Sequence, residues 1–160
     1  MGALPANGSR HVGVVVVEDS RSDALLIIEG LRQEGLNLDV LLLTDGEKAW
    51  DHFVDSEEVG MLPLGGPDLI LLDLNLPKKS GAELIREIKA NPNLRDVPVV
   101  VFSGSDPSEV WRCYELGANL VVRKPQDVQP FVRTIQGIKR YCLRGAKARR
   151  VSQRVSPEMA

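Results

Sequence analysis

Short apolar runs separated by amphipathic stretches are the feature that most limits how this chain can fold. Five runs have the composition of strands, at residues 12–17, 38–43, 69–72, 97–102 and 120–122. Most are rich in Val, Leu and Ile without alternating polar residues, which is typical of strands covered on both faces. A stretch with helical spacing follows each run. This alternation predicts an α/β fold, with one doubly wound, five-stranded parallel sheet between two layers of helices.

Capping patterns indicate where the predicted helices begin. Three of them open with a hydroxyl residue followed three positions later by an acid, as in a capping box: Ser20–Asp23, Thr44–Glu47 and Ser80–Glu83. Asp106 and Asp127 are the expected N-caps of the last two helices. These five starts place one helix after each predicted strand.

Length and composition fit one globular domain in a reducing compartment. The chain has 160 residues, of which 43% are hydrophobic and 26% charged. Its longest apolar run, residues 12–17, is far shorter than the roughly 18 residues of a membrane span, and no secretory signal is visible. Two cysteines, Cys113 and Cys142, are too few for a disulfide framework. We therefore expect a cytoplasmic protein.

The charge distribution divides the chain into three expected segments. Residues 1–10 are expected to be disordered, residues 11–143 to form the domain, and residues 144–160 to form a flexible basic tail. The tail has five basic residues and one acid, giving +4, so the rest of the chain carries −6 of the net −2. An acidic body disfavours broad nucleic-acid contact, and we expect no DNA-binding domain after the last strand.

Polar residues stand where four of the predicted strands end. They are Glu18 and Asp19 after the first, Asp73 after the third, Ser103 after the fourth and Lys124 after the fifth. Because ligands bind at the carboxyl ends of parallel strands, we look for chemistry there. Crowded carboxylates need a cation, and oxygen ligands without Cys or His favour Mg²⁺. A carboxylate can accept a phosphoryl group and a lysine can hold its oxygens, so the pattern indicates Mg²⁺-assisted phosphoryl transfer to an aspartate.

The same residues lie in motifs that resemble a known family. The motifs are VVVVEDS at 14–20, DLILLDLNLPKKSGAELIREIK at 68–89, PVVVFSGSD at 98–106 and LGANLVVRKP at 116–125. Over about residues 12–143 the chain is similar to the receiver domains of two-component response regulators. The DLNLPKKSG and NPNLRDVPVVV stretches further resemble the small single-domain regulators associated with bacterial and cyanobacterial phytochromes. The resemblance implies a flavodoxin-like (βα)5 sheet with strand order 2-1-3-4-5.

The resemblance also implies a metal and acceptor role for each acid at the strand ends. Asp73 would be the phosphoacceptor and a metal ligand. Asp19 would bind Mg²⁺ directly and Glu18 through a water molecule, while Asn75 would offer its backbone carbonyl. The implied function is a signalling domain rather than an enzyme, apart from assistance to its own phosphorylation and slow dephosphorylation.

The remaining implied roles belong to the last two strand ends. Ser103 would be the switch hydroxyl that binds the phosphoryl group, and Lys124 would pair with the phosphoryl oxygens. The Lys124–Pro125 bond would be cis, as is usual in the family. Val121 departs from the family pattern, since receivers usually carry Tyr or Phe three residues before the lysine. The usual coupling of the hydroxyl to a swinging aromatic ring therefore cannot operate through this position.

The implied partners are a sensor histidine kinase, of the bacteriophytochrome type, and a second copy of the chain. Phytochrome-associated receivers form homodimers through the fourth helix, fifth strand and last helix. Helical spacing predicts that Cys113 and Tyr114 face the sheet while Trp111 lies outside that arc. In the last helix, the same spacing predicts that Val128 faces the core and that Tyr141 faces away from it. Exposed aromatic side chains are favoured interface anchors, which supports a dimer.

Two alternative functions remain open at this point. A haloacid-dehalogenase-type phosphatase also uses an aspartate nucleophile, but it needs a second aspartate two residues later, where this chain has Asn75. A pseudo-receiver, acting only as an interaction domain, would be expected to lack the acceptor, the acids or the lysine. This chain has all of them. The downstream protein partner cannot be named from the sequence.

Overall fold

The computed structural model describes residues 12–33, 38–58, 66–104, 106 and 108–155. Five parallel strands form one sheet in the order β2-β1-β3-β4-β5. The strands are β1 (Val12–Val17), β2 (Leu38–Leu43), β3 (Leu69–Leu72), β4 (Val99–Ser103) and β5 (Leu120–Arg123). The predicted fold class and strand order are therefore confirmed. β4 begins two residues later than predicted and includes Ser103.

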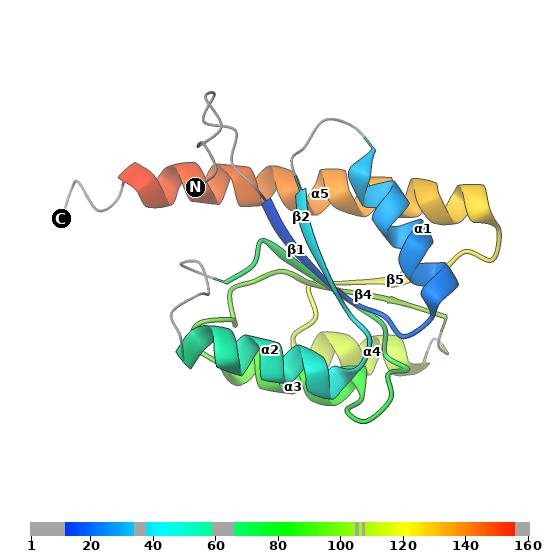
Figure 1. The fold of residues 1–160 in the computed structure, drawn as a ribbon, viewed down its shortest axis with the longest axis horizontal. Helices are drawn as coiled ribbons and strands as arrows, with labels where there is room; N and C mark the ends of the chain where they lie inside the picture. Colours follow the sequence, from blue (N-terminus) through cyan, green and yellow to red (C-terminus); the bar gives the residue numbers. More distant parts are fainter. Residues whose placement is uncertain (1–11, 34–37, 59–65, 105, 107, 156–160) are drawn as a thin grey trace, which may run out of the picture.

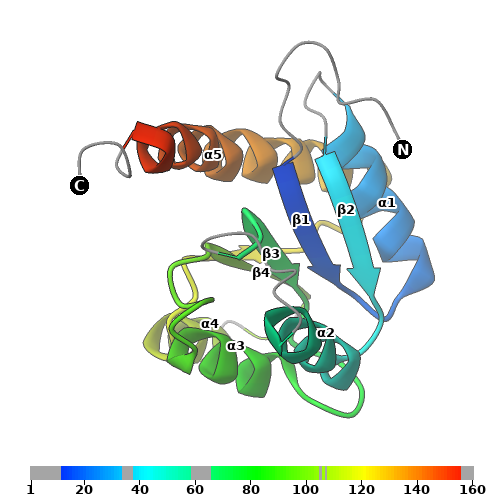
Figure 2. The same ribbon diagram turned by 60° about the vertical axis from the view of Figure 1, so that its left-hand side comes forward.

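Two layers of helices cover the sheet. The helices are α1 (Arg21–Arg32), α2 (Gly46–Glu58), α3 (Gly81–Ala90), α4 (Ser108–Leu116) and α5 (Val128–Val155). In Figures 1 and 2, α1 and α5 lie on one face of the sheet, and α2, α3 and α4 lie on the other. None of the described helices combines the length and the apolar composition that a membrane crossing requires.

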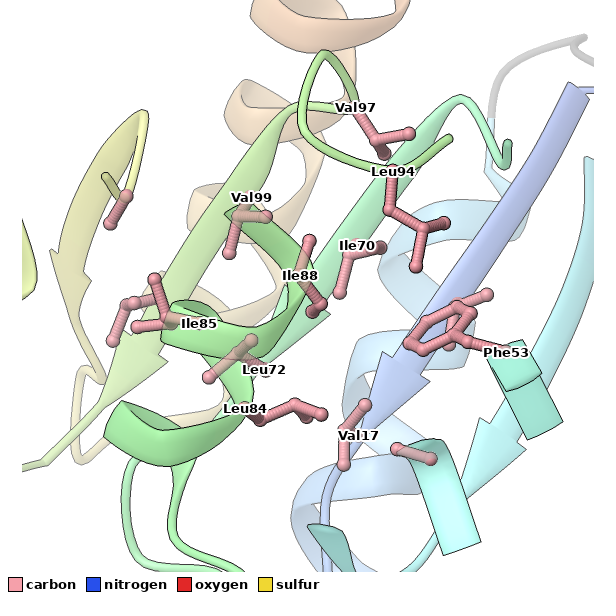
Figure 3. Close-up of a cluster of buried hydrophobic side chains, with 14 of the residues drawn as sticks. Val17, Phe53, Ile70, Leu72, Leu84, Ile85, Ile88, Leu94, Val97 and Val99 are labelled. Carbon is pink, nitrogen blue, oxygen red and sulfur yellow. The ribbon is translucent and has the colours of Figure 1, made fainter. Parts of the chain in front are cut away.

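The two faces of the sheet carry separate apolar cores because successive side chains of a strand point to opposite sides. Val15 and Val17 of β1 belong to the core shared with α2, α3 and α4, where Phe53 and Leu84 are fully buried. Figure 3 shows this cluster, with Ile70 and Leu72 of β3 at its centre. Val14 and Val16 belong to the opposite core, which includes Ile27 of α1 and Ile135 of α5. Burial on both faces explains the near-continuous apolar strands.

Two of the predicted helix caps, Ser20 and Ser80, are confirmed. Ser20 Oγ accepts from Asp23 N–H at 3.4 Å, and Ser80 Oγ accepts from Glu83 N–H at 3.2 Å. The prediction of Thr44 as the cap of the second helix is wrong. Asp45 caps it, accepting from Lys48 N–H at 2.7 Å, because the helix begins at Gly46 and the cap must directly precede the first helical residue.

The last helix is longer than predicted. The backbone of α5 is helical to Val155, so it continues past the expected domain boundary at residue 143. In Figure 1 its C-terminal half extends beyond the sheet. Residues 1–10 and 156–160 lie outside the described residues. The predicted flexibility of the tail stays a prediction.

Helical spacing predicted some side-chain directions correctly and others wrongly. Trp111 and Tyr141 are 76% and 78% exposed, and Cys113 is buried, as expected. Val128 is exposed because it is the first residue of α5, outside the packed part of the helix. Tyr114 is 41% exposed rather than buried. Its hydroxyl accepts from the Val121 backbone N–H at 3.1 Å, so Tyr114 reaches the outer edge of β5 instead of the sheet face.

Candidate functional site

The predicted site residues lie together at the carboxyl edge of the sheet. Backbone hydrogen bonds continue just beyond the strands and fix them there. Glu18 N–H donates to Leu43 O at 3.0 Å, and Asp73 N–H donates to Val17 O at 3.1 Å. Lys124 N–H donates to Ser103 O, also at 3.0 Å. The side chains that follow the apolar strands are thus held by the sheet itself.

The Asp73 carboxylate is the centre of the site. The Asp73 side chain is 9% exposed, and both of its oxygens accept hydrogen bonds. Ser103 Oγ donates to Oδ1 at 2.8 Å, the Asn75 backbone N–H donates to Oδ1 at 3.1 Å, and Lys124 Nζ donates to Oδ2 at 2.8 Å. Asn75 occupies the position where the phosphatase alternative needs a second acid. It contacts Asp73 through its backbone and supplies no general acid.

Three carboxylates form a group with the spacing of a metal site. Glu18, Asp19 and Asp73 each offer an oxygen atom, and these atoms lie within 4.8 Å of one another. Glu18 and Asp73 are buried, whereas Asp19 is exposed. Burial raises the pKa of Glu18 to about 7, opposed by the hydrogen bond from Lys124 and assisted by the charge of Asp73. An all-oxygen set with one solvent-facing member suits Mg²⁺, which retains several water molecules.

Lys124 is the cation of the site and has more partners than the sequence indicated. Its Nζ donates to Glu18 Oε2 at 2.8 Å, Asp73 Oδ2 at 2.8 Å and Asp23 Oδ2 at 2.9 Å. Burial lowers the pKa of Lys124, but these three partners outweigh burial and hold its pKa above the ordinary value. Asp23 was predicted only as part of a capping box. Asp23 lies in the first turn of α1, the helix that directly follows β1. That position could have indicated that its side chain also lies near the carboxyl ends of the strands.

The peptide bond after Lys124 differs from the expectation. Lys124–Pro125 is trans, since the described residues contain no cis peptide bond. An X–Pro bond prefers the trans form by about 0.5–1 kcal/mol unless the fold demands otherwise. The Lys124 side chain reaches Asp73 from this trans backbone, so a cis bond is not needed to aim it here.

A small cavity lies beside Ser103 and Val121. A cavity of about 150 Å³ is lined by Leu74, Ser103, Val110 and Val121, among others. Tyr114 of α4 lies next to this region, with its hydroxyl on the Val121 N–H. The aromatic side chain that contacts β5 at Val121 is thus Tyr114, which comes from α4.

Gly81 controls how closely α3 approaches the backbone of the loop that follows β3. A Cβ atom at residue 81 would lie 2.5 Å from Asp73 O and 2.7 Å from Leu74 Cα. Overpacking of this kind costs about 1–3 kcal/mol, so we expect Gly81→Ala to lower the free energy of unfolding by that amount. Urea denaturation measures the change. Gly137→Ala is the control, since no atom lies within 4 Å of its added Cβ and it should be neutral or slightly stabilising. Equal stability of the two variants would contradict the packing.

Comparison with known proteins gives a consistent result. The family model of the response regulator receiver domain matches residues 14–136. The response regulator Rcp1 of Synechocystis sp. is 37% identical over 131 residues, which cover 81% of this chain and 88% of Rcp1. The crystal structure of the Mn²⁺-bound form of Rcp1 superposes with a TM-score of 0.73, covering 80% of this chain and 91% of that one. The phosphorylated cyanobacterial phytochrome response regulator RcpA is 35% identical with a TM-score of 0.77, covering 84% and 95%.

Proposed function

Because this chain belongs to the response regulator receiver domain family, we propose that Asp73 accepts a phosphoryl group from a sensor histidine kinase. The chain then signals through contacts with other proteins. The observation that carries the proposal is the Asp73 carboxylate, which is bound by both Ser103 and Lys124 beside two further acids. Receivers form a family of signalling proteins rather than classical enzymes.

The reaction needs one nucleophile and groups that stabilise charge. An oxygen of the Asp73 carboxylate forms a bond to the phosphorus of a phosphohistidine, and the phosphorus–nitrogen bond breaks. The electron pair stays on the imidazole nitrogen of the donor, which takes a proton from water. Ser103 donates a hydrogen bond and Lys124 donates a charged hydrogen bond to the transferred oxygens, which are crowded with negative charge.

A divalent cation fits the acid group, and we propose Mg²⁺. Asp19 and Asp73 would hold it through their oxygens and Glu18 through a water molecule, with the Asn75 backbone carbonyl as a further ligand. When bound, it neutralises charge on the phosphoryl oxygens. The Mn²⁺-bound form of the relative Rcp1 supports a divalent ion in this family.

The metal proposal predicts that Mg²⁺ stabilises the fold. At 100 times its dissociation constant, Mg²⁺ should add about 2.7 kcal/mol to the free energy of unfolding, measured by thermal denaturation. The gain should be larger at pH 8 than at pH 6, because Glu18 has a pKa of about 7 and must lose its proton to bind a cation. Asp19→Asn should reduce the gain, whereas Asp39→Asn, an exposed acid of β2, should not. A gain that is the same in all three proteins would contradict the site.

We propose a phytochrome-type histidine kinase as the phosphoryl donor. The support is the likeness to RcpA, a phytochrome response regulator. Such a kinase uses ATP, so the transfer takes place in the cytoplasm. The test is incubation with acetyl phosphate and Mg²⁺, and then with the phosphorylated kinase, followed by intact mass spectrometry. A mass increase of one phosphoryl group that is lost at alkaline pH supports an acyl phosphate, and an unchanged mass with every donor refutes the proposal.

We also propose a homodimer through α4, β5 and α5. The support is the exposure of Trp111 and Tyr141, two large aromatic side chains on the helices of this face. Such residues are frequent anchors of interfaces, and removing one costs about 2 kcal/mol or more of binding. Trp111→Ala should therefore raise the dimer dissociation constant by about 30-fold.

Light scattering coupled to size-exclusion chromatography measures this change, at about 50 µM protein with and without beryllofluoride. Leu25→Ala is the control, since Leu25 is an exposed apolar residue of α1, away from the proposed face. A monomer in both conditions refutes the dimer. A dimer whose dissociation constant is unchanged in both Trp111→Ala and Leu25→Ala would place the interface elsewhere.

A further inference from the structure

Lys124 uses all of its hydrogen-bonding capacity on three carboxylates. An ammonium group has three N–H donors. Here they meet Glu18, Asp73 and Asp23, at 2.8, 2.8 and 2.9 Å. Two of these acids, Glu18 and Asp73, belong to the group with metal-site spacing, and Asp23 does not. Asp23 is thus the one partner of Lys124 that neither the metal nor the phosphoryl group would engage.

Asp23 belongs to a capped helix that packs against the sheet. It lies in the first turn of α1, and its backbone N–H donates to the capping Ser20 Oγ. The next residue, Ala24, and Ile27 are buried in the apolar layer between α1 and the sheet. The packing of α1 therefore places the Asp23 carboxylate beside the carboxyl ends of the strands.

Asp23 also lies on the open side of Lys124. It lines a cavity of about 620 Å³ together with Gly104, Lys124 and Phe131, among others. Asp73 and Glu18, by contrast, are buried. Lys124 is consequently held from the inside by Glu18 and Asp73 and from the outer side by Asp23.

The three contacts of Lys124 would change in different ways during phosphoryl transfer. Phosphorylation converts the Asp73 carboxylate into a mixed anhydride, so that Lys124 loses one carboxylate partner and gains the phosphoryl oxygens. A cation on Glu18 weakens a second contact. We propose that Asp23 is a positioning residue that keeps the Lys124 ammonium at the phosphoryl-transfer site while its other partners change. This inference rests on the proposed role of Asp73 as phosphoacceptor.

The first test reads the position of Lys124 without metal or phosphoryl donor. The ¹⁵N–¹H signal of the Lys124 ammonium is assigned by its loss in Lys124→Arg. It should be visible in the wild type, because three hydrogen bonds slow its exchange with water. In Asp23→Ala we expect the exchange to accelerate and the signal to broaden, and in Asp23→Glu we expect it to persist. Glu29→Ala removes an exposed acid from the same helix and should leave the signal unchanged.

The second test reads the rate of phosphorylation by acetyl phosphate. Loss of one charged hydrogen bond should slow Asp23→Ala by about tenfold. Asp23→Glu should recover most of the rate, and Glu29→Ala should match the wild type. An unchanged Lys124 signal or an unchanged rate in Asp23→Ala would overturn the positioning role. A wild-type chain that is never phosphorylated would refute the proposed function, while the ammonium signal would still decide whether Asp23 holds Lys124.

Discussion

Asp73→Asn should leave the chain folded and unable to form an acyl phosphate. Asn has the same shape as Asp, so the hydrogen bonds to the Ser103 hydroxyl and the Asn75 N–H can be kept. An amide oxygen is a far weaker nucleophile than a carboxylate and gives no stable phosphoryl adduct. The expected loss is complete within the sensitivity of intact mass spectrometry after incubation with acetyl phosphate and Mg²⁺.

The control for this variant is Asp51→Asn, which changes an exposed aspartate of α2. It should be phosphorylated like the wild type. Circular dichroism and thermal denaturation show whether Asp73→Asn is folded under the same conditions. Undiminished phosphorylation of folded Asp73→Asn would contradict the assignment.

The sheet was predictable because its sequence signal is local and strong. The run from Val12 to Val17 is buried on both faces between two apolar cores, which explains why it lacks alternation. The parallel arrangement follows from the alternation of strands and helices. The order of the strands came from the resemblance to receivers, since periodicity says nothing about which strand lies beside which.

The positions of side chains on α4 were less predictable. Helical spacing groups Cys113 and Tyr114 into one arc, but it does not say how far that arc extends over the sheet. α4 packs near the edge strand β5, so that Cys113 is buried while the Tyr114 hydroxyl reaches the outer N–H of Val121. The free edge of β5 offers an unpaired N–H there, and only the assembled sheet reveals it.

The candidate site was predictable where the strand ends supply it and not where a helix does. Glu18, Asp73 and Lys124 directly follow apolar runs. The carboxyl ends of parallel strands meet at one edge of the sheet, so these residues were expected to lie together. Asp23 sits in a capping box, and that local explanation accounts for its presence. Its hydrogen bond with Lys124 joins residues that are 101 positions apart in the sequence. It therefore depends on where α1 lies relative to the carboxyl end of the sheet.

Lys124→Met should be strongly destabilising, because it removes the cation from a cluster of carboxylates. The Lys124 side chain is 12% exposed, and Asp73 and Glu18 are buried beside it. Removing one partner of a buried ion pair typically costs about 3–5 kcal/mol, since the remaining charge has no compensation. For a chain of this size the melting temperature should fall by about 10 °C.

Two measurements separate this charge effect from a loss of packing. Mg²⁺ should stabilise Lys124→Met more than it stabilises the wild type, because the metal ion then supplies the positive charge that Glu18 and Asp73 have lost. Lys48→Met is the control, since the Lys48 side chain is 62% exposed and its Nζ is 3.9 Å from Asp45 Oδ2. Contacts of such exposed lysines are screened by solvent and contribute about 0–1 kcal/mol. If Lys124→Met melts like Lys48→Met, the carboxylates do not depend on Lys124 for their charge balance. Because phosphorylation places still more negative charge at this point, that result would also remove the reason for assigning Lys124 to the phosphoryl oxygens.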